Sequence, residues 1–224
     1  MHIRRDRLFA LLLAVAVFFL ILTASIGLPI YIRPFYYAHI RALELPEVSG
    51  FTADQIRFAY DEVLDYLTLP GREFGTGDMA CSEAAADHFA DCKVLFDLNA
   101  WVLLGSAAVI GVLLILQRKG ILGPLKLGNR TGPFWGALAA VGIPLVVGFL
   151  AALDFNRAFV IFHSIFFPGK DNWLFNWYTD QIIRVLPQQF FMNCAILIGA
   201  GILAMSLGVM IWEIWKEKKH DCQA

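Results

Sequence analysis

The chain has 224 residues, of which 58% are hydrophobic and only 17% are charged, and its mean hydropathy is +0.63. A soluble domain has about 25% charged residues, and one of this length could not bury so much apolar surface, which excludes a soluble monomer and a disordered chain. The formal net charge of −1 gives no electrostatic basis for binding nucleic acid.

Four apolar runs are each long enough to cross a hydrocarbon core, which takes about 20 helical residues. Backbone groups in lipid must pair within their own segment, so we expect helices. A cleaved signal peptide is the alternative for the first run, but Thr23-Ala24-Ser25 is a poor cleavage site followed by more apolar sequence. We therefore predict one all-α integral membrane domain over residues 1–224. Its four transmembrane helices are predicted at residues 8–30, 98–116, 134–153 and 192–212.

Basic residues are concentrated outside the spans in three short segments. Ten of the 18 lysines and arginines lie in residues 1–7, 117–133 and 213–224. The two longer loops, 31–97 and 154–191, have the other eight against fifteen acidic residues. The positive-inside rule then predicts a multi-pass cell-membrane protein with both termini cytoplasmic and the two long loops outside.

The first outer loop, at 67 residues, is too long to lack structure. Thr52 followed by Gln55 predicts a capped helix start, and Pro70-Gly71 predicts its end. A second helix is predicted to start at Ser82 and to run toward the span at 98–116. Between Thr52 and Pro70 the apolar residues recur at helical spacing: Ile56, Tyr60, Val63, Leu64 and Leu67. We expect a mainly helical extracellular cap formed by the two outer loops.

The second outer loop stays apolar and aromatic after the third span has ended. An interfacial aromatic belt would explain Trp173, Trp177 and Tyr178 individually. It does not explain the continuous apolar run at residues 159–167. We expect this stretch to lie in the outer headgroup layer and to cover part of a cavity.

Two of the five histidines, His88 and His163, each lie within about ten residues of a span end on the outer side. Ionisable groups near membrane depth are candidates for a functional site, although each could be a buried structural donor. A serine triad through Ser164 has poor geometry, because this residue directly follows His163. A metal site could combine the histidines with Asp87 or Asp91, but no tight pair of metal ligands occurs. We expect no metal and no cofactor.

Two cysteines, Cys81 and Cys92, lie on the outer side, where a disulfide can persist. On one straight helix they would be about 16 Å apart, which is too far to bridge. A disulfide requires Cys81 to precede the helix and fold back. A disulfide and two free thiols both remain open from the sequence.

Two stretches around these histidines resemble the lipoprotein intramolecular transacylase family. The first, His88-Phe89-Ala90-Asp91-Cys92-Lys93, is similar to that family's His-Met-x-Asp-Val-Lys. The second is Phe162-His163-Ser164-Ile165-Phe166-Phe167, which continues through Asp171, Trp173 and Asp180. Phe89 and Cys92 depart from the family, which has Met and Val there.

The resemblance implies an acyltransferase that acts on diacylated bacterial lipoproteins at the outer face of the cell membrane. It would move the sn-2 acyl chain of the diacylglyceryl-modified N-terminal cysteine to that cysteine's α-amino group, which gives a lyso-form lipoprotein. The implied catalytic pair is His88 and His163, by general acid/base catalysis. The substrate-binding or supporting residues that it implies are Asp91, Lys93, Asp171, Trp173 and Asp180.

The expected partners are these lipoproteins and membrane lipid, with no nucleic acid and no obligate protein partner. The alternative is a non-enzymatic protein that binds lipid or senses the envelope, in which the aromatic loop docks lipid. A transporter is less favoured because no predicted span has an internal charge.

Overall fold

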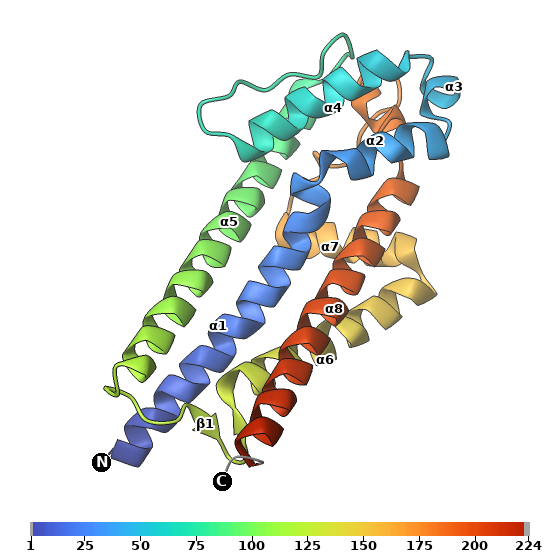
Figure 1. Ribbon diagram of the computed structural model, residues 1–224. Coiled ribbons are helices and arrows are strands. Elements are labelled where there is room, and N and C mark those ends of the chain that lie inside the picture. Colours follow the sequence, from blue (N-terminus) through green and yellow to red (C-terminus); the bar gives the residue numbers. More distant parts are fainter. Residues whose placement is uncertain (1, 222–224) are drawn as a thin grey trace. The chain divides into compact units, whose positions relative to one another are not determined.

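The computed structural model describes residues 2–221, which form mainly helices (Figure 1). The chain divides into two compact units. Unit 1 comprises Met1–Leu28, Ala100–Phe149 and Leu197–Ala224, and unit 2 comprises Pro29–Asn99 and Leu150–Ile196. The elements in chain order are α1 (His2–Tyr31), α2 (Arg33–Ala42), α3 (Leu45–Ser49), α4 (Ala53–Thr68), α5 (Glu83–Arg118), β1 (Lys126–Leu127), β2 (Arg130–Thr131), α6 (Gly132–Leu153), α7 (Phe155–Phe166), the 3-10 helix η1 (Gln181–Arg184) and α8 (Gln188–Asp221).

Three helices of the described chain are long and apolar enough to cross a membrane, and they confirm three of the predicted spans as helices. They are Arg5–Tyr31 in α1, Glu83–Arg118 in α5 and Gln188–Lys216 in α8. The fourth predicted span, 134–153, forms the helix α6 with Pro144 inside it. Within α6, Gly132–Val146 is a shorter apolar helix, so a membrane crossing by α6 stays a prediction.

Helix α5 is longer than a bilayer requires. Its 36 residues measure about 54 Å at 1.5 Å per residue, against a hydrocarbon core of about 30 Å. The apolar residues 98–116 are sufficient to span that core. The first part of the helix instead carries five charged side chains: Glu83, Asp87, Asp91, Lys93 and Asp97. This charged end, which includes His88, therefore lies outside the spanning segment.

Small residues bring α1 and α6 close together in unit 1. Gly132 lies so near α1 that a Cβ there would be 2.5 Å from the carbonyl oxygen of Ala10. Gly136, one turn later, lies closer still to α1, against the carbonyl oxygen of Ala14. Because lipid tails are as apolar as the helices, such close backbone approach is a main source of helix association in membranes.

A two-stranded antiparallel hairpin joins α5 to α6, and the sequence reading did not predict it. Lys126 pairs with Thr131 and Leu127 pairs with Arg130. Gly128 in the connecting turn has a φ of +67°, a conformation that glycine adopts without steric cost. A Gly-Asn pair between two short strands is a recognised hairpin signal.

Unit 2 is built around an aromatic core. The rings of Tyr36 from α2 and Tyr60 from α4 are stacked with centroids 3.7 Å apart. The Tyr36 hydroxyl donates a 2.8 Å hydrogen bond to the carbonyl of Val185. The Arg33 guanidinium pairs with the carboxylates of Asp61 and Asp65, which adds ionic contacts between α2 and α4.

The helices predicted within residues 31–97 are confirmed, and this segment contains two more. Thr52 and Gln55 form the predicted capping box at the start of α4, and α5 follows Ser82. Helices α2 and α3, each with proline in the first turn, were not predicted. The aromatic stretch that follows α6 forms the helix α7. Asp154 caps its first turn by accepting a 2.9 Å hydrogen bond from the backbone N–H of Arg157.

Candidate functional site

His88 lies near the start of α5, in a helix end that other parts of unit 2 hold in place. Asp180 accepts a 2.8 Å hydrogen bond from the backbone N–H of Ser82, the residue before α5. The Ser82 hydroxyl in turn accepts from the N–H of Ala85. The His88 side chain is buried, and its ring contacts those of Phe167 and Phe175 at centroid distances of 4.9 and 5.6 Å.

His163 lies in the last turn of α7 and is also buried. Its Nδ1 is 2.7 Å from the carbonyl oxygen of Phe159, one turn earlier. A carbonyl can only accept, so Nδ1 is the protonated nitrogen and the lone pair of the neutral ring is on Nε2. Phe159 and Trp173 flank the ring, with centroids 4.2 and 4.5 Å away.

The structure brings the two histidines together, although they are 75 residues apart in the sequence. Their ring centroids are 5.7 Å apart and their planes are inclined by 31°. Burial, and then the neighbouring His163, lower the pKa of His88 from 6.5 to about 4. Burial also lowers the pKa of His163. Both imidazoles are therefore neutral at pH 7, and either can accept a proton.

The two nitrogens of His88 differ in their surroundings. Its Nε2 is 3.5 Å from the Sγ of Cys92, one turn along α5. Its Nδ1 is buried and has no hydrogen-bond partner in the described part of the chain. Burial raises the pKa of Cys92 to about 12, so this thiol is a neutral and weak donor at pH 7.

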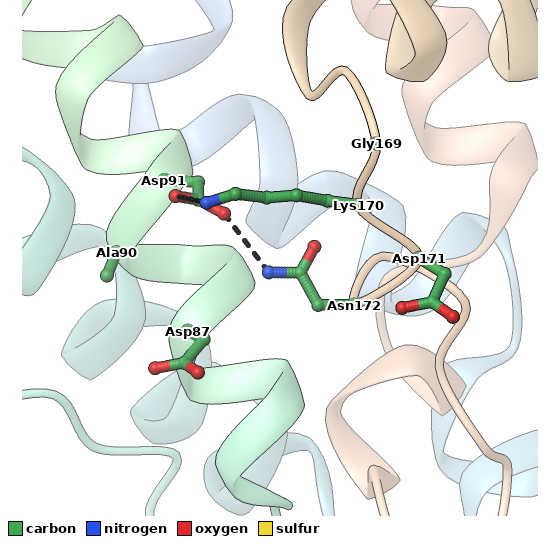
Figure 2. A pocket seen from close by; sticks show the side chains of 7 residues that line it. All are labelled: Asp87, Ala90, Asp91, Gly169, Lys170, Asp171 and Asn172. Atoms are coloured by element: carbon green, nitrogen blue, oxygen red, sulfur yellow. Dashed lines mark hydrogen bonds and ion pairs between the residues drawn. The ribbon is translucent and has the colours of Figure 1, made fainter.

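A polar pocket of about 410 Å³ lies along the same turn of α5 (Figure 2). One wall is α5 itself and the other is the loop after α7. Asp91 accepts hydrogen bonds from the Lys170 ammonium at 2.5 Å and from the Asn172 amide at 3.0 Å, which join the two walls. The lining residues are Asp87, Ala90, Asp91, Gly169, Lys170, Asp171 and Asn172.

The other residues implied by the family resemblance have separate surroundings. Asp171 is exposed in the pocket lining, and Trp173 packs on His163. Asp180 is buried and binds backbone N–H groups. Lys93 points elsewhere, because its ammonium donates to the carbonyls of Tyr66 and Leu69 at the end of α4.

Cys81 and Cys92 are both free thiols in the structure, so the disulfide that the sequence left open does not form there. Cys81 does precede α5, as a disulfide would require, but Cys92 lies against His88 instead. Among residues 2–221, no group of three or more His, Cys, Asp or Glu side chains is placed to hold a metal ion.

Sequence reasoning missed Phe159, Lys170 and Asn172. Phe159 precedes His163 by four residues, and that helical spacing could have identified the carbonyl that binds Nδ1. Lys170 and Asn172 follow Pro168-Gly169, a pair that predicts a turn and no particular function for its neighbours. Only the fold shows that they meet Asp91.

Comparisons with known proteins agree with the resemblance seen in the sequence. The model of the family "Lipoprotein intramolecular transacylase Lit" matches residues 11–191. An in meso structure of the membrane-integral lipoprotein intramolecular transacylase Lit from Bacillus cereus is 25% identical, with a TM-score of 0.88 over 98% of this chain and 99% of that chain.

Two further structures of the Bacillus cereus protein show the same fold, each with one histidine replaced. The variant with arginine is 24% identical, with a TM-score of 0.83 over 99% of this chain and 96% of that chain. The variant with alanine is 24% identical, with a TM-score of 0.80 over 96% of each chain. No curated protein sequence matches this chain.

Proposed function

This chain belongs to the lipoprotein intramolecular transacylase family, and from that premise we propose that it converts diacylated lipoproteins to their lyso form. The sn-2 acyl chain of the diacylglyceryl-modified N-terminal cysteine would move to the α-amino group of the same cysteine. The observation that carries this proposal is the pair of buried, neutral imidazoles with centroids 5.7 Å apart.

The reaction needs a base and then an acid. An α-amine has a pKa of about 7.7–8.0, so at neutral pH most of it is protonated and cannot attack. The amine nitrogen forms a bond to the ester carbonyl carbon, and the bond from that carbon to the glycerol oxygen breaks. The ammonium form first releases one proton to solvent. As the neutral amine attacks, a second N–H proton passes to an imidazole and then to the glycerol oxygen, which leaves as a hydroxyl. Donor and acceptor belong to one molecule, so no acyl-enzyme is required.

The two imidazoles suit this proton transfer. His163 is bound through Nδ1 to the Phe159 carbonyl, which leaves the lone pair of Nε2 to accept a proton. His88 is the second buried imidazole next to it, and both pKa values lie below 6.5. At pH 7 both rings are therefore in the neutral form that accepts a proton, and a pKa of about 4 also makes His88 a weaker base than an ordinary imidazole.

The remaining residues would have supporting or binding roles. We assign Trp173 to positioning His163, on which its ring packs. We assign Asp180 to positioning the start of α5, where it accepts from the N–H of Ser82. Asp91 and Asp171 lie in the pocket lining and would bind polar groups of the lipoprotein's N-terminal region. Lys93 would support the cap by closing the end of α4.

In the membrane, we propose four spans with α6 as the third, both termini in the cytoplasm and the histidines on the outer side. The distribution of basic residues supports this orientation. The test is labelling of single-cysteine variants in intact cells at Asp78 and Asn129, both exposed, with an impermeant reagent. We expect labelling at Asp78 alone, and labelling at Asn129 alone would reverse the topology.

The decisive test of function is tandem mass spectrometry of a diacylglyceryl-cysteine lipopeptide incubated with the purified protein. The N-acyl, lyso product has the same total mass as the substrate, so we expect its fragments to show one acyl chain on the α-amino group and one fewer on the glycerol. His88→Ala and His163→Ala should each lower the rate by about 10²–10⁴-fold, typical of a lost general acid or base. The double variant should lose little more, because groups that act together are not additive.

His39 provides the matched control. It also binds a carbonyl one turn earlier through Nδ1, that of Phe35 at 2.7 Å. Its Nε2, however, is 2.9 Å from the side-chain nitrogen of Asn193, so both ring nitrogens are occupied. His39→Ala should keep most of the activity. Near-full turnover in a folded His88→Ala or His163→Ala protein would refute the pair, and no acyl migration by the unmodified protein would favour the lipid-binding alternative.

A further inference from the structure

Two buried polar atoms of the site lack hydrogen-bond partners among the described residues: Nδ1 of His88 and Oδ1 of Asn172. A buried polar atom without a partner costs about 1–3 kcal/mol. The two atoms are chemically complementary, because a ring nitrogen can donate and an amide oxygen can only accept.

The orientation of the Asn172 amide is determined by its other contact. Its Nδ2 donates a 3.0 Å hydrogen bond to Asp91, whose second oxygen accepts from the Lys170 ammonium at 2.5 Å (Figure 2). A carboxylate cannot donate, so the reversed amide would place oxygen against oxygen. Asp91 and Lys170 therefore hold the amide with its nitrogen toward α5, which leaves Oδ1 free for another donor.

Asn172 is also near enough to His88 to act on its proton equilibrium. Burial is the largest influence on the pKa of His88 and lowers it, as do His163 and Lys170, whereas the charge of Asp91 and then the Asn172 side chain raise it. Cys92, on the same helix, is the remaining titratable group in contact with the ring. Asn172 is thus an uncharged group that favours protonation of His88.

We infer that Asn172 is a positioning residue for His88: its Oδ1 accepts a hydrogen bond from Nδ1–H and so directs the lone pair to Nε2. This inference rests on the proposed function. His163 has the same arrangement, with the Phe159 carbonyl in the place of Oδ1. Both rings would then present Nε2 as the proton acceptor. At His88 the competing partner of Nε2 is only the Cys92 thiol, at 3.5 Å, which an amine can displace as a stronger donor.

The direct test is ¹⁵N NMR of the histidine rings, with the full chain in lipid nanodiscs and the His88 signals assigned by their loss in His88→Ala. In the unmodified protein at pH 7.5 we expect His88 to carry its proton on Nδ1. Asn172→Leu preserves the approximate shape but removes the oxygen. In this variant the Nδ1–H form should no longer dominate, and the pKa of His88 should fall further.

Activity provides the second readout. With the lipopeptide as substrate, Asn172→Leu should lower kcat by about 10–100-fold, as is typical when a partner that orients a histidine is lost, while KM changes little. The matched control is Asn176→Leu, the same substitution in the same loop. In the described part of the chain the exposed Asn176 side chain accepts from the N–H of Tyr178 and does not contact His88. This control should leave both the His88 spectrum and kcat unchanged.

A second, charge-preserving variant tests the inference even if the leucine variant misfolds. In the double variant Asp91→Asn with Asn172→Asp, the amide and the carboxylate trade places and the contact between them can reform. A carboxylate would then face His88, so the Nδ1–H form should persist and the pKa of His88 should rise.

The inference is overturned if Asn172→Leu folds and keeps the tautomer and pKa of the unmodified protein, or if the exchange leaves that pKa unchanged. The NMR result does not depend on turnover. An unmodified protein that has the expected tautomer but transfers no acyl group would contradict the proposed function and not the positioning of His88.

Discussion

Units 1 and 2 are both stabilised by buried apolar side chains, but of different kinds. The buried core of unit 1 is aliphatic: Ala10, Leu13, Val17, Ile21, Leu113, Leu122, Leu125, Ala137, Ala140 and Ile202. The buried core of unit 2 includes Tyr36, Tyr60, Phe89 and Phe190. Unit 2 also contains the ion pairs of Arg33 and the two histidines.

The difference follows from the interactions that stabilise helices in each environment. Helices in lipid gain little from burying one apolar side chain against another, so unit 1 depends on close backbone approach at Gly132 and Gly136. In unit 2, aromatic rings surround polar groups and exclude water from them. That is how His88 and His163 remain neutral and close together. Substitutions in the two units should therefore act through different mechanisms.

The largest loss of stability should come from Asp180 in unit 2. Its carboxylate accepts from the backbone N–H groups of Ser82 and Asn176 at 2.8 and 2.9 Å and from the Thr179 hydroxyl at 3.1 Å. Asp180→Ala leaves these donors without a partner, so we expect a loss of about 3–5 kcal/mol of unfolding free energy. Hydrogen exchange should increase at the start of α5 and in residues 174–182.

The control for this prediction is Asp78→Ala. Asp78 is exposed, and among the described residues its carboxylate accepts one hydrogen bond, at 3.3 Å from the Gln55 side chain. Its removal should therefore change stability by less than about 0.5 kcal/mol. If the two variants unfold at the same temperature, the carboxylate of Asp180 does not organise unit 2.

The corresponding test of unit 1 is Gly136→Ala compared with Gly142→Ala, the same substitution twice in α6. At Gly136 the new methyl group would collide with the Ala14 carbonyl, whereas nothing lies within 4 Å of it at Gly142. We expect Gly136→Ala to destabilise by about 1–3 kcal/mol, as overpacking does. Gly142→Ala should be neutral or stabilising by up to about 1 kcal/mol, because alanine favours helix.

Thermal unfolding in one detergent measures both variants, and hydrogen exchange locates the effect. Faster exchange should appear in α1 and α6 and not around His88. Equal stability of the two alanine variants would show that α1 and α6 do not rely on close approach.

Features of unit 2 that depend on neighbouring residues were predictable from the sequence. The capping box of Thr52 and Gln55 is one, since cap and partner are three residues apart. The topology also predicted that His88 and His163 would share one side of the membrane. It could not predict that their rings would meet, because that depends on α7 and the following loop, whose packing is not local.

Contacts that depend on tertiary packing were not predictable in the same way. Asparagine is a common turn residue, and only the contact with Asp91 distinguishes Asn172 from other residues of that turn. The Gly132-x-x-x-Gly136 spacing is visible in the sequence, yet its partner helix is not. In both cases the residue type was compatible with several structures, and the contact selected one of them.

The last effect concerns pH, and it should be confined to unit 2, which contains both histidines. The pKa of His88 is about 4 in the folded protein and about 6.5 in an unfolded chain, and that of His163 is also lowered. Between these two values the unfolded chain binds more protons than the folded one. Stability therefore falls as pH decreases from 6.5 toward 4 and is unaffected by these groups above about pH 7.

For His88 alone, acidification from pH 7 to pH 5 should lower the unfolding free energy by about 2 kcal/mol. Asp91 contributes little in this interval, because its ordinary pKa of 3.8 already lies below pH 5 and the hydrogen bonds from Lys170 and Asn172 lower that pKa further. The measurement is thermal unfolding at both pH values in the same detergent, with hydrogen exchange to locate the loss in unit 2. His88→Asn with His163→Asn should flatten the dependence. An equally steep pH dependence in that double variant would mean that other groups in unit 2 titrate, and that the aromatic shell does not keep these histidines neutral.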